Sequence, residues 1–165
     1  MVILGIDPGY AIVGWGVIEK LSNGKCVVVN YGAITTDKDM PFPDRLLKIK
    51  KDLEELIEKF KPQVLAIEEL FFNTNTTTAI KVAQARGVVV ATCHEKGLLI
   101  YEYTPLQIKQ ALTGFGRAEK QQIQYMTKMM LGLKAVPKPD DTADALAVAL
   151  THAQTNNRLN SNLMR

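Results

Sequence analysis

Acidic residues stand where two apolar segments of this chain end. Asp7 follows the apolar run 2–6, and Glu68 and Glu69 follow the run 64–67. Open α/β sheets bind ligands outside the carboxyl ends of their strands. If the two runs are parallel neighbours in one sheet, these carboxylates meet at its edge, where chemistry is expected.

Further acids lie near the start of the last predicted helix. Asp141 and Asp144 are three residues apart, which places them on one helix face. Acids at a helix N-terminus also cap it and interact with its dipole, for ~0.3 to 1 kcal/mol each. That purely structural role is favoured for Asp140. Asp144 lies beyond the cap and precedes Ala145 and Leu146, so we expect it to point toward the sheet.

A cluster of carboxylates favours a hard divalent cation, because without one the acids would raise one another's pKa values. Mg²⁺ prefers oxygen ligands, retains water and often pairs with substrate phosphate. Two such ions ~3.5 to 4 Å apart can activate a water molecule and stabilise a leaving oxygen at phosphorus. The pattern therefore predicts phosphodiester hydrolysis. With only two histidines in the chain, a Ser/His/Asp or Cys/His grouping is not indicated.

Positive charge is concentrated in one stretch, although the net charge is only +3. Between residues 105 and 138 a single acid, Glu119, stands among six basic residues. These are Lys109, Arg117, Lys120, Lys128, Lys134 and Lys138. The stretch is a candidate phosphate-facing surface, whereas the nearly balanced helix 44–61 resembles a solvated helix face.

The hydrophobic pattern predicts the elements that position these residues. Three antiparallel strands come first, and Asn23-Gly24 is a strong hairpin signal between the second and third. Helices and strands then alternate, which specifies a mixed five-stranded sheet flanked by helices, an α/β fold. The predicted strands are 2–6, 13–18, 26–33, 64–67 and 98–103, and the helices are 44–61, 76–96, 105–112, 118–131 and one from Asp140 or Asp141 onward. On helix 76–96 the residues available for burial are Ala79, Ile80, Ala83, Val90 and Cys93.

Composition indicates one ordinary globular domain. The chain has 165 residues, 47% of them hydrophobic and 22% charged, which is typical of an autonomous fold. We expect a single domain over 1–156 and a flexible tail over 157–165. With no signal-peptide pattern, no membrane span and Cys26 and Cys93 far apart, we expect a protein of the reducing cytoplasm that does not bind membranes.

Five short segments, in order from about residue 2 to 153, resemble those of the RuvC family of bacterial crossover-junction endonucleases. They are LGIDPG at 4–9, AIE at 66–68, QARG at 84–87, AEK at 118–120 and DTADALA at 141–147. The resemblance implies a ribonuclease H-like fold and cleavage of four-way DNA (Holliday) junctions in recombination and repair. It also implies that Asp7, Glu68, Asp141 and Asp144 bind two Mg²⁺ ions, with Mn²⁺ able to substitute. Only the resemblance selects Glu68 over Glu69.

The resemblance also implies contacts with DNA. Lys109 and Lys120 would act near the scissile phosphate, although solvated surface positions are the alternative for both. Phe71 would meet bases at the junction centre, where an aromatic past a strand end can stack for ~1 to 3 kcal/mol, but Phe72 is an equally placed candidate. Two arginines complete the expected DNA-binding set, Arg86 and Arg117. Phe115, between two glycines, is a further candidate wedge.

A four-way junction has two strands to cut symmetrically, so a two-fold homodimer is the economical geometry. The alanine and valine face of helix 76–96 could supply its interface, with core packing as the alternative. Family members work with the RuvA and RuvB branch-migration proteins, which are therefore expected partners.

Other interpretations remain. A Gly-Ile-Asp strand before a glycine turn also opens the sugar kinase and actin-like ATPases, which need a second lobe. A nuclease of the same fold that processes ribosomal RNA precursors would not be expected to carry the long helix 76–96. A third interpretation is a junction-binding module without catalytic activity, and the presence of all four carboxylates argues against it.

Overall fold

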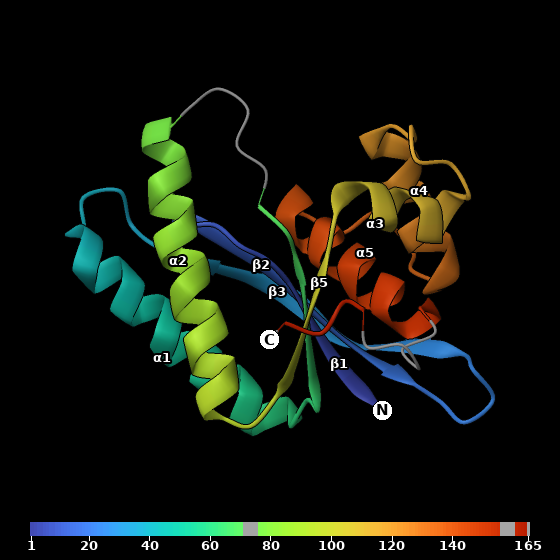
Figure 1. Ribbon diagram of the computed structural model, residues 1–165, viewed down its shortest axis with the longest axis horizontal. Helices are drawn as coiled ribbons and strands as arrows, with labels where there is room; N and C mark the ends of the chain where they lie inside the picture. Colours follow the sequence, from blue (N-terminus) through green and yellow to red (C-terminus); the bar gives the residue numbers. More distant parts are fainter. Residues whose placement is uncertain (71–75, 156–160, 165) are drawn as a thin grey trace.

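A five-stranded mixed sheet forms the centre of the molecule (Figure 1). The computed structural model describes residues 1–70, 76–155 and 161–164. The strands are β1 (Val2–Asp7), β2 (Ile12–Lys20), β3 (Cys26–Thr35), β4 (Val64–Glu68) and β5 (Leu99–Tyr103). Their order is β3-β2-β1-β4-β5, with β1 antiparallel to β2 and parallel to β4. β2 and β3 are antiparallel and β4 and β5 parallel, so the predicted mixed sheet is confirmed.

Helices cover both faces of the sheet (Figure 1). They are α1 (Phe42–Phe60), α2 (Thr76–Glu95), α3 (Pro105–Thr113), α4 (Lys120–Met130) and α5 (Asp140–Gln154). α1 and α2 lie on one face, and α3, α4 and α5 lie on the other. Successive strand side chains point to opposite faces: Leu4 and Ile6 join the core beneath α1 and α2, and Ile3 joins the core beneath α5. The result is three layers.

α5 packs directly on the backbone of β1 and β2 because glycines leave room for it. A Cβ atom at Gly5 would lie 2.0 Å from the carbonyl oxygen of Ala145, and one at Gly14 would lie 2.0 Å from that of Asp141. No side chain fits in such a gap, so these glycines set the height of α5 above the sheet. They therefore also place the first turn of α5.

Two expectations for the helices were wrong, the first only in part. On α2 Cys93 is buried as predicted, and Ala79 and Val90 are partly buried. Ile80, however, is 61% exposed and Ala83 is exposed, and Ala85 and Val89 are buried instead. α2 is apolar on several faces, so its composition did not indicate which one meets the core. At α5, Pro139 occupies the position before the helix and no side chain caps it. Asp140 instead accepts a hydrogen bond from Lys138 at 2.6 Å.

Residues 161–164 pair with the edge of β5. The Glu102 amide donates to the carbonyl of Asn162, and the Met164 amide donates to that of Ile100, both at 2.9 Å. Nothing in the sequence indicated this pairing. Among the described helices, none combines the length and apolar character needed to cross a bilayer.

Candidate active site

The four predicted carboxylates gather at one edge of the sheet. Asp7 is the last residue of β1 and Glu68 the last residue of β4, and the pairing of Ile6 with Ile67 puts these two acids side by side. Asp141 and Asp144 lie in the first turns of α5, which the sheet glycines hold close. All four side chains are partly buried.

Electrostatics show how closely these groups interact. Burial, and after it the neighbouring Asp144, Glu68 and Asp141, together raise the pKa of Asp7 to about 8, although Lys120 opposes the shift. Burial and Asp144 likewise raise the pKa of Glu68. Burial also raises the pKa of Asp144, against the opposing effect of Lys120. A shared environment with too much negative charge explains these shifts.

A divalent cation would relieve this repulsion. Among residues 1–70, 76–155 and 161–164, no group of three or more His, Cys, Asp or Glu side chains is placed to hold a metal ion as it stands. Mg²⁺ does not need such a cage, because it is commonly bound through one or two carboxylates while water and substrate phosphate fill its shell. The coupling of Asp7 to Glu68, Asp141 and Asp144 supplies carboxylates of that kind.

Two lysines face the carboxylates. Lys120 Nζ lies 2.9 Å from Asp144 Oδ2 and 3.8 Å from Asp140 Oδ2. Lys109 lowers the pKa of Glu68, which places its charge nearby. A cavity of ≈ 210 Å³ lies among these groups. It is lined by Glu68, Pro105, Ile108, Lys109, Lys120, Ile123, Asp144 and Ala147. Cations and carboxylates thus share one small cavity, as a phosphodiester substrate requires.

Arg86, predicted to bind DNA, makes contacts within the protein. Its guanidinium forms an ion pair with Glu102 of β5, and its Nε donates to the backbone carbonyl of Glu68 at 3.4 Å. Arg86 therefore connects α2 to the ends of two strands, directly behind Glu68. Sequence reasoning missed Glu102, although a charged residue between Tyr101 and Tyr103 in a strand was a usable signal.

The remaining candidates lie in different places. Arg117 and Phe115 are exposed in the segment between α3 and α4. Glu69 is exposed, and its backbone amide donates to the Tyr103 carbonyl at 2.9 Å. Phe71 and Phe72 fall outside the described residues.

Comparison with known proteins supports the resemblance. Residues 3–152 match the family described as "Crossover junction endodeoxyribonuclease RuvC". A protein of that name from Desulfitobacterium hafniense (strain DSM 10664 / DCB-2) is 56% identical over 160 residues, which cover 97% of this chain and 96% of the relative. Another from Alkaliphilus metalliredigens (strain QYMF) is 58% identical over 157 residues, or 94% of each chain.

Solved structures give the same result for the fold. One described as T. thermophilus RuvC in complex with Holliday junction substrate has a TM-score of 0.88 at 39% identity and covers 93% of both chains. The yeast mitochondrial Holliday junction resolvase has a TM-score of 0.66 at 15% identity, covering 92% of this chain and 78% of that one, which shows a common fold. The predicted ribonuclease H-like fold is confirmed.

Proposed function

Because the chain belongs to the RuvC family of crossover junction endodeoxyribonucleases, we propose that it resolves four-way DNA junctions by paired, symmetric hydrolysis of two phosphodiester bonds with two Mg²⁺ ions per active site. Mn²⁺ would substitute. The observation that carries this proposal is the gathering of Asp7, Glu68, Asp141 and Asp144 at one sheet edge, opposite two lysines.

Each residue has a distinct task in this proposal. The four carboxylates would hold the ions, which when bound would supply an activated water and stabilise the leaving oxygen. Lys109 and Lys120 bind the non-bridging oxygens of the scissile phosphate, where fixed positive charge stabilises the developing negative charge. Until substrate arrives, Lys120 serves as the counter-ion of Asp144. Arg117 provides a further phosphate contact, and Phe71 or Phe72 meets the junction bases.

A homodimer would place two such sites on the two opposed strands of a junction. Support comes from an exposed face of α2, here called the α2 stripe, on which small or apolar residues recur at steps of three and four. It consists of Ile80, Ala83, Gly87 and Ala91. RuvA and RuvB are the partners we expect, and the free thiols of Cys26 and Cys93 suit the cytoplasm.

The test is cleavage of a synthetic four-way junction. We expect the wild-type chain with Mg²⁺ to release nicked duplexes by paired incisions, leaving linear duplex and RNA hybrids uncut. Asp7→Asn should bind the junction without cutting it, because one negative charge of the metal-binding group is lost. Asp39→Asn is the matched control, because Asp39 is an exposed acid outside the group of four carboxylates, and this variant should cut normally. Unchanged cleavage by Asp7→Asn would contradict the proposed role of Asp7 in a metal-dependent mechanism.

A further inference from the structure

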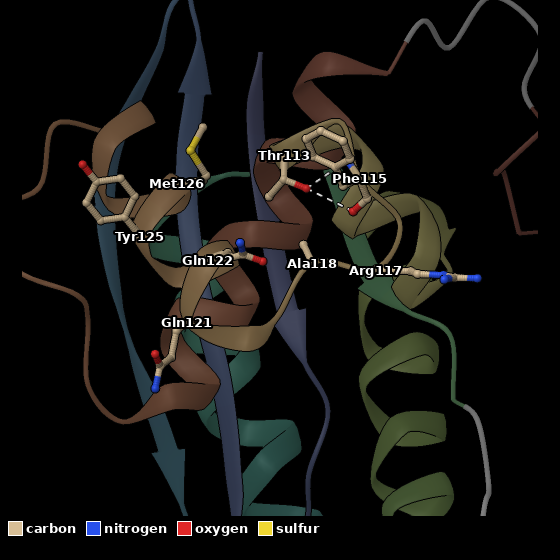
Figure 2. Close-up of a pocket in the computed structure, with 8 residues that line it drawn as sticks. All are labelled: Thr113, Phe115, Arg117, Ala118, Gln121, Gln122, Tyr125 and Met126. Atoms are coloured by element: carbon tan, nitrogen blue, oxygen red, sulfur yellow. Dashed lines mark hydrogen bonds between the residues drawn. The ribbon is translucent and has the colours of Figure 1, made fainter.

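A second hollow lies beside the active site, between the α3–α4 loop and α4. Figure 2 shows its lining, with the rings of Phe115 and Tyr125 on different sides and Met126 between them. Its volume is ≈ 710 Å³. The lining residues are Thr113, Phe115, Arg117, Ala118, Gln121, Gln122, Tyr125 and Met126. Phe115 is 74% exposed and Tyr125 is 56% exposed, so two aromatic rings stand open to solvent here.

The loop holds Phe115 in place through the turn that carries an active-site lysine. The Phe115 amide donates to Thr113 Oγ1 at 3.1 Å, and the Thr113 hydroxyl donates to the Lys109 carbonyl at 2.8 Å. Gly114 closes α3 with a φ of 76°, a conformation that glycine adopts readily. The backbone of Phe115 is therefore held next to the helical turn that carries Lys109.

The hollow and the active-site cavity occupy adjacent faces of α4. Lys120 and Ile123 line the cavity that contains Glu68 and Asp144. The next residues around the helix, Gln121 and Gln122 followed one turn later by Tyr125 and Met126, line the hollow. A DNA strand whose phosphate is held by Lys109 and Lys120 would therefore have its neighbouring nucleotides over the hollow.

The chemistry of the lining suits a nucleotide. Aromatic rings stack on bases, glutamine amides can pair with base edges, and no residue of the lining is acidic. Arg117 projects outward at the rim (Figure 2), where it can reach a phosphate. We propose that this hollow is a subsite for an unstacked nucleotide of the junction, next to the scissile phosphate, with Phe115 and Tyr125 as stacking platforms. This rests on the proposed function.

Junction affinity of Phe115 variants tests the subsite in an Asp7→Asn background, where the DNA stays intact. Because a base stacked on an aromatic ring contributes substantially to affinity, we expect Phe115→Ala to raise the Kd about tenfold. Phe115→Trp should retain the wild-type Kd, whereas Phe115→Leu, apolar without a flat face, should behave like the alanine variant. Leu47→Ala, 49% exposed on α1, is the matched control and should leave the Kd unchanged.

Photocrosslinking locates the nucleotide. With 5-iodouracil scanned through the junction strand, we expect crosslinks to Phe115 or Tyr125 only at positions next to the incised phosphate. Equal Kd values for the Asp7→Asn protein with and without Phe115→Ala, or crosslinks only at other positions, would overturn the subsite. Failure of the wild-type chain to cut junctions would count against the proposed function instead, while the affinity comparison still decides the subsite.

Discussion

At the scale of single residues, the carboxylates at the sheet edge repel one another, and Lys120 opposes part of that repulsion. Burial and the neighbouring carboxylates together raise the pKa of Asp7 to about 8, so in the absence of a cation this carboxyl holds a proton near neutral pH. The ammonium group of Lys120 relieves only part of the repulsion. These charges are costly to the fold, which is expected where residues are selected for chemistry rather than for stability.

His152 provides a separate, purely structural effect of pH. It is 1% exposed, its Nδ1 lies 2.7 Å from the Tyr103 hydroxyl, and Lys20 is nearby. Burial, aided by Lys20, lowers its pKa from 6.5 to about 4. Below pH 6.5 the unfolded chain therefore binds a proton at His152, whereas the folded chain does so only near pH 4. The folded state is consequently favoured above pH 6.5 and loses stability as the pH falls.

We expect the depressed pKa of His152 to lower the free energy of unfolding by about 3 kcal/mol as the pH falls from 7 to 4. His152→Gln, which does not titrate there, should lose that much less stability over the same interval, even if it is less stable at pH 7. Urea denaturation at several pH values measures this. The raised pKa of Asp7 changes stability with pH in the opposite direction, but Asp7 is present in both wild type and His152→Gln, so its effect cancels in the comparison. An identical pH slope for His152→Gln and wild type would refute the assignment.

At the scale of elements, most of the fold could be predicted because short apolar runs and alternating segments mark the strands, and residues recurring every three to four positions mark most of the helices. Asp7 and Glu68 could be paired from topology alone, since a strand, helix, strand crossover makes their strands parallel. The buried face of α2 could not be predicted, because apolar residues surround much of that helix. The pairing of Arg86 with Glu102 depends on the register of β4 and β5, which local sequence does not encode.

Gly14 tests whether glycines in β2 determine the position of the α5 carboxylates. A Cβ atom there would lie 2.0 Å from the Asp141 carbonyl oxygen and 2.9 Å from its Cβ. Gly14→Ala must push the first turn of α5 outward, at a cost of about 1–3 kcal/mol. Because displacements near 1 Å can cost about 10²-fold in rate, junction cleavage by the folded protein should fall by that order.

The matched control is Gly24→Ala. Gly24 lies in the hairpin between β2 and β3 with a φ of 83°, so a side chain there strains the backbone, but a Cβ atom would meet nothing within 4 Å. It should lower thermal stability similarly but leave the cleavage rate of the folded fraction within a few-fold of wild type. Equal losses of cleavage in both variants would show that the position of α5 is not the cause.

Arg86 distinguishes a supporting contact from a DNA contact. We expect Arg86→Gln to slow cleavage by tenfold or more, because the end of β4 that carries Glu68 loses its link to α2 and β5, while the Kd for the junction stays within twofold. Glu102→Gln should show the same pattern, since it removes the other half of the ion pair. Cleavage kinetics and binding isotherms separate the two cases. A large rise in Kd for Arg86→Gln alone would instead place Arg86 on the DNA.

At the scale of the whole molecule, the layers separate two tasks. α3, α4 and α5 lie on one face of the sheet (Figure 1). Residues of these helices and of the α3–α4 loop line the cavity with the lysines and Asp144 and the hollow beside it. α2 lies on the opposite face, with the α2 stripe exposed. A second copy docked on that stripe would leave the α3–α4 side of each subunit free for DNA. Paired incision then depends on an interface remote from the chemistry.

Ala83→Arg tests that arrangement. Ala83 lies in the middle of the α2 stripe, and a buried arginine without a partner charge would oppose docking of a second chain. We expect the variant to sediment as a monomer at concentrations where the wild type is a dimer, and to nick junctions on one strand rather than in pairs. Leu47→Arg adds the same charge to an exposed apolar position on α1 and should remain dimeric. If Ala83→Arg stays dimeric and still cuts in pairs, the second copy docks on another surface.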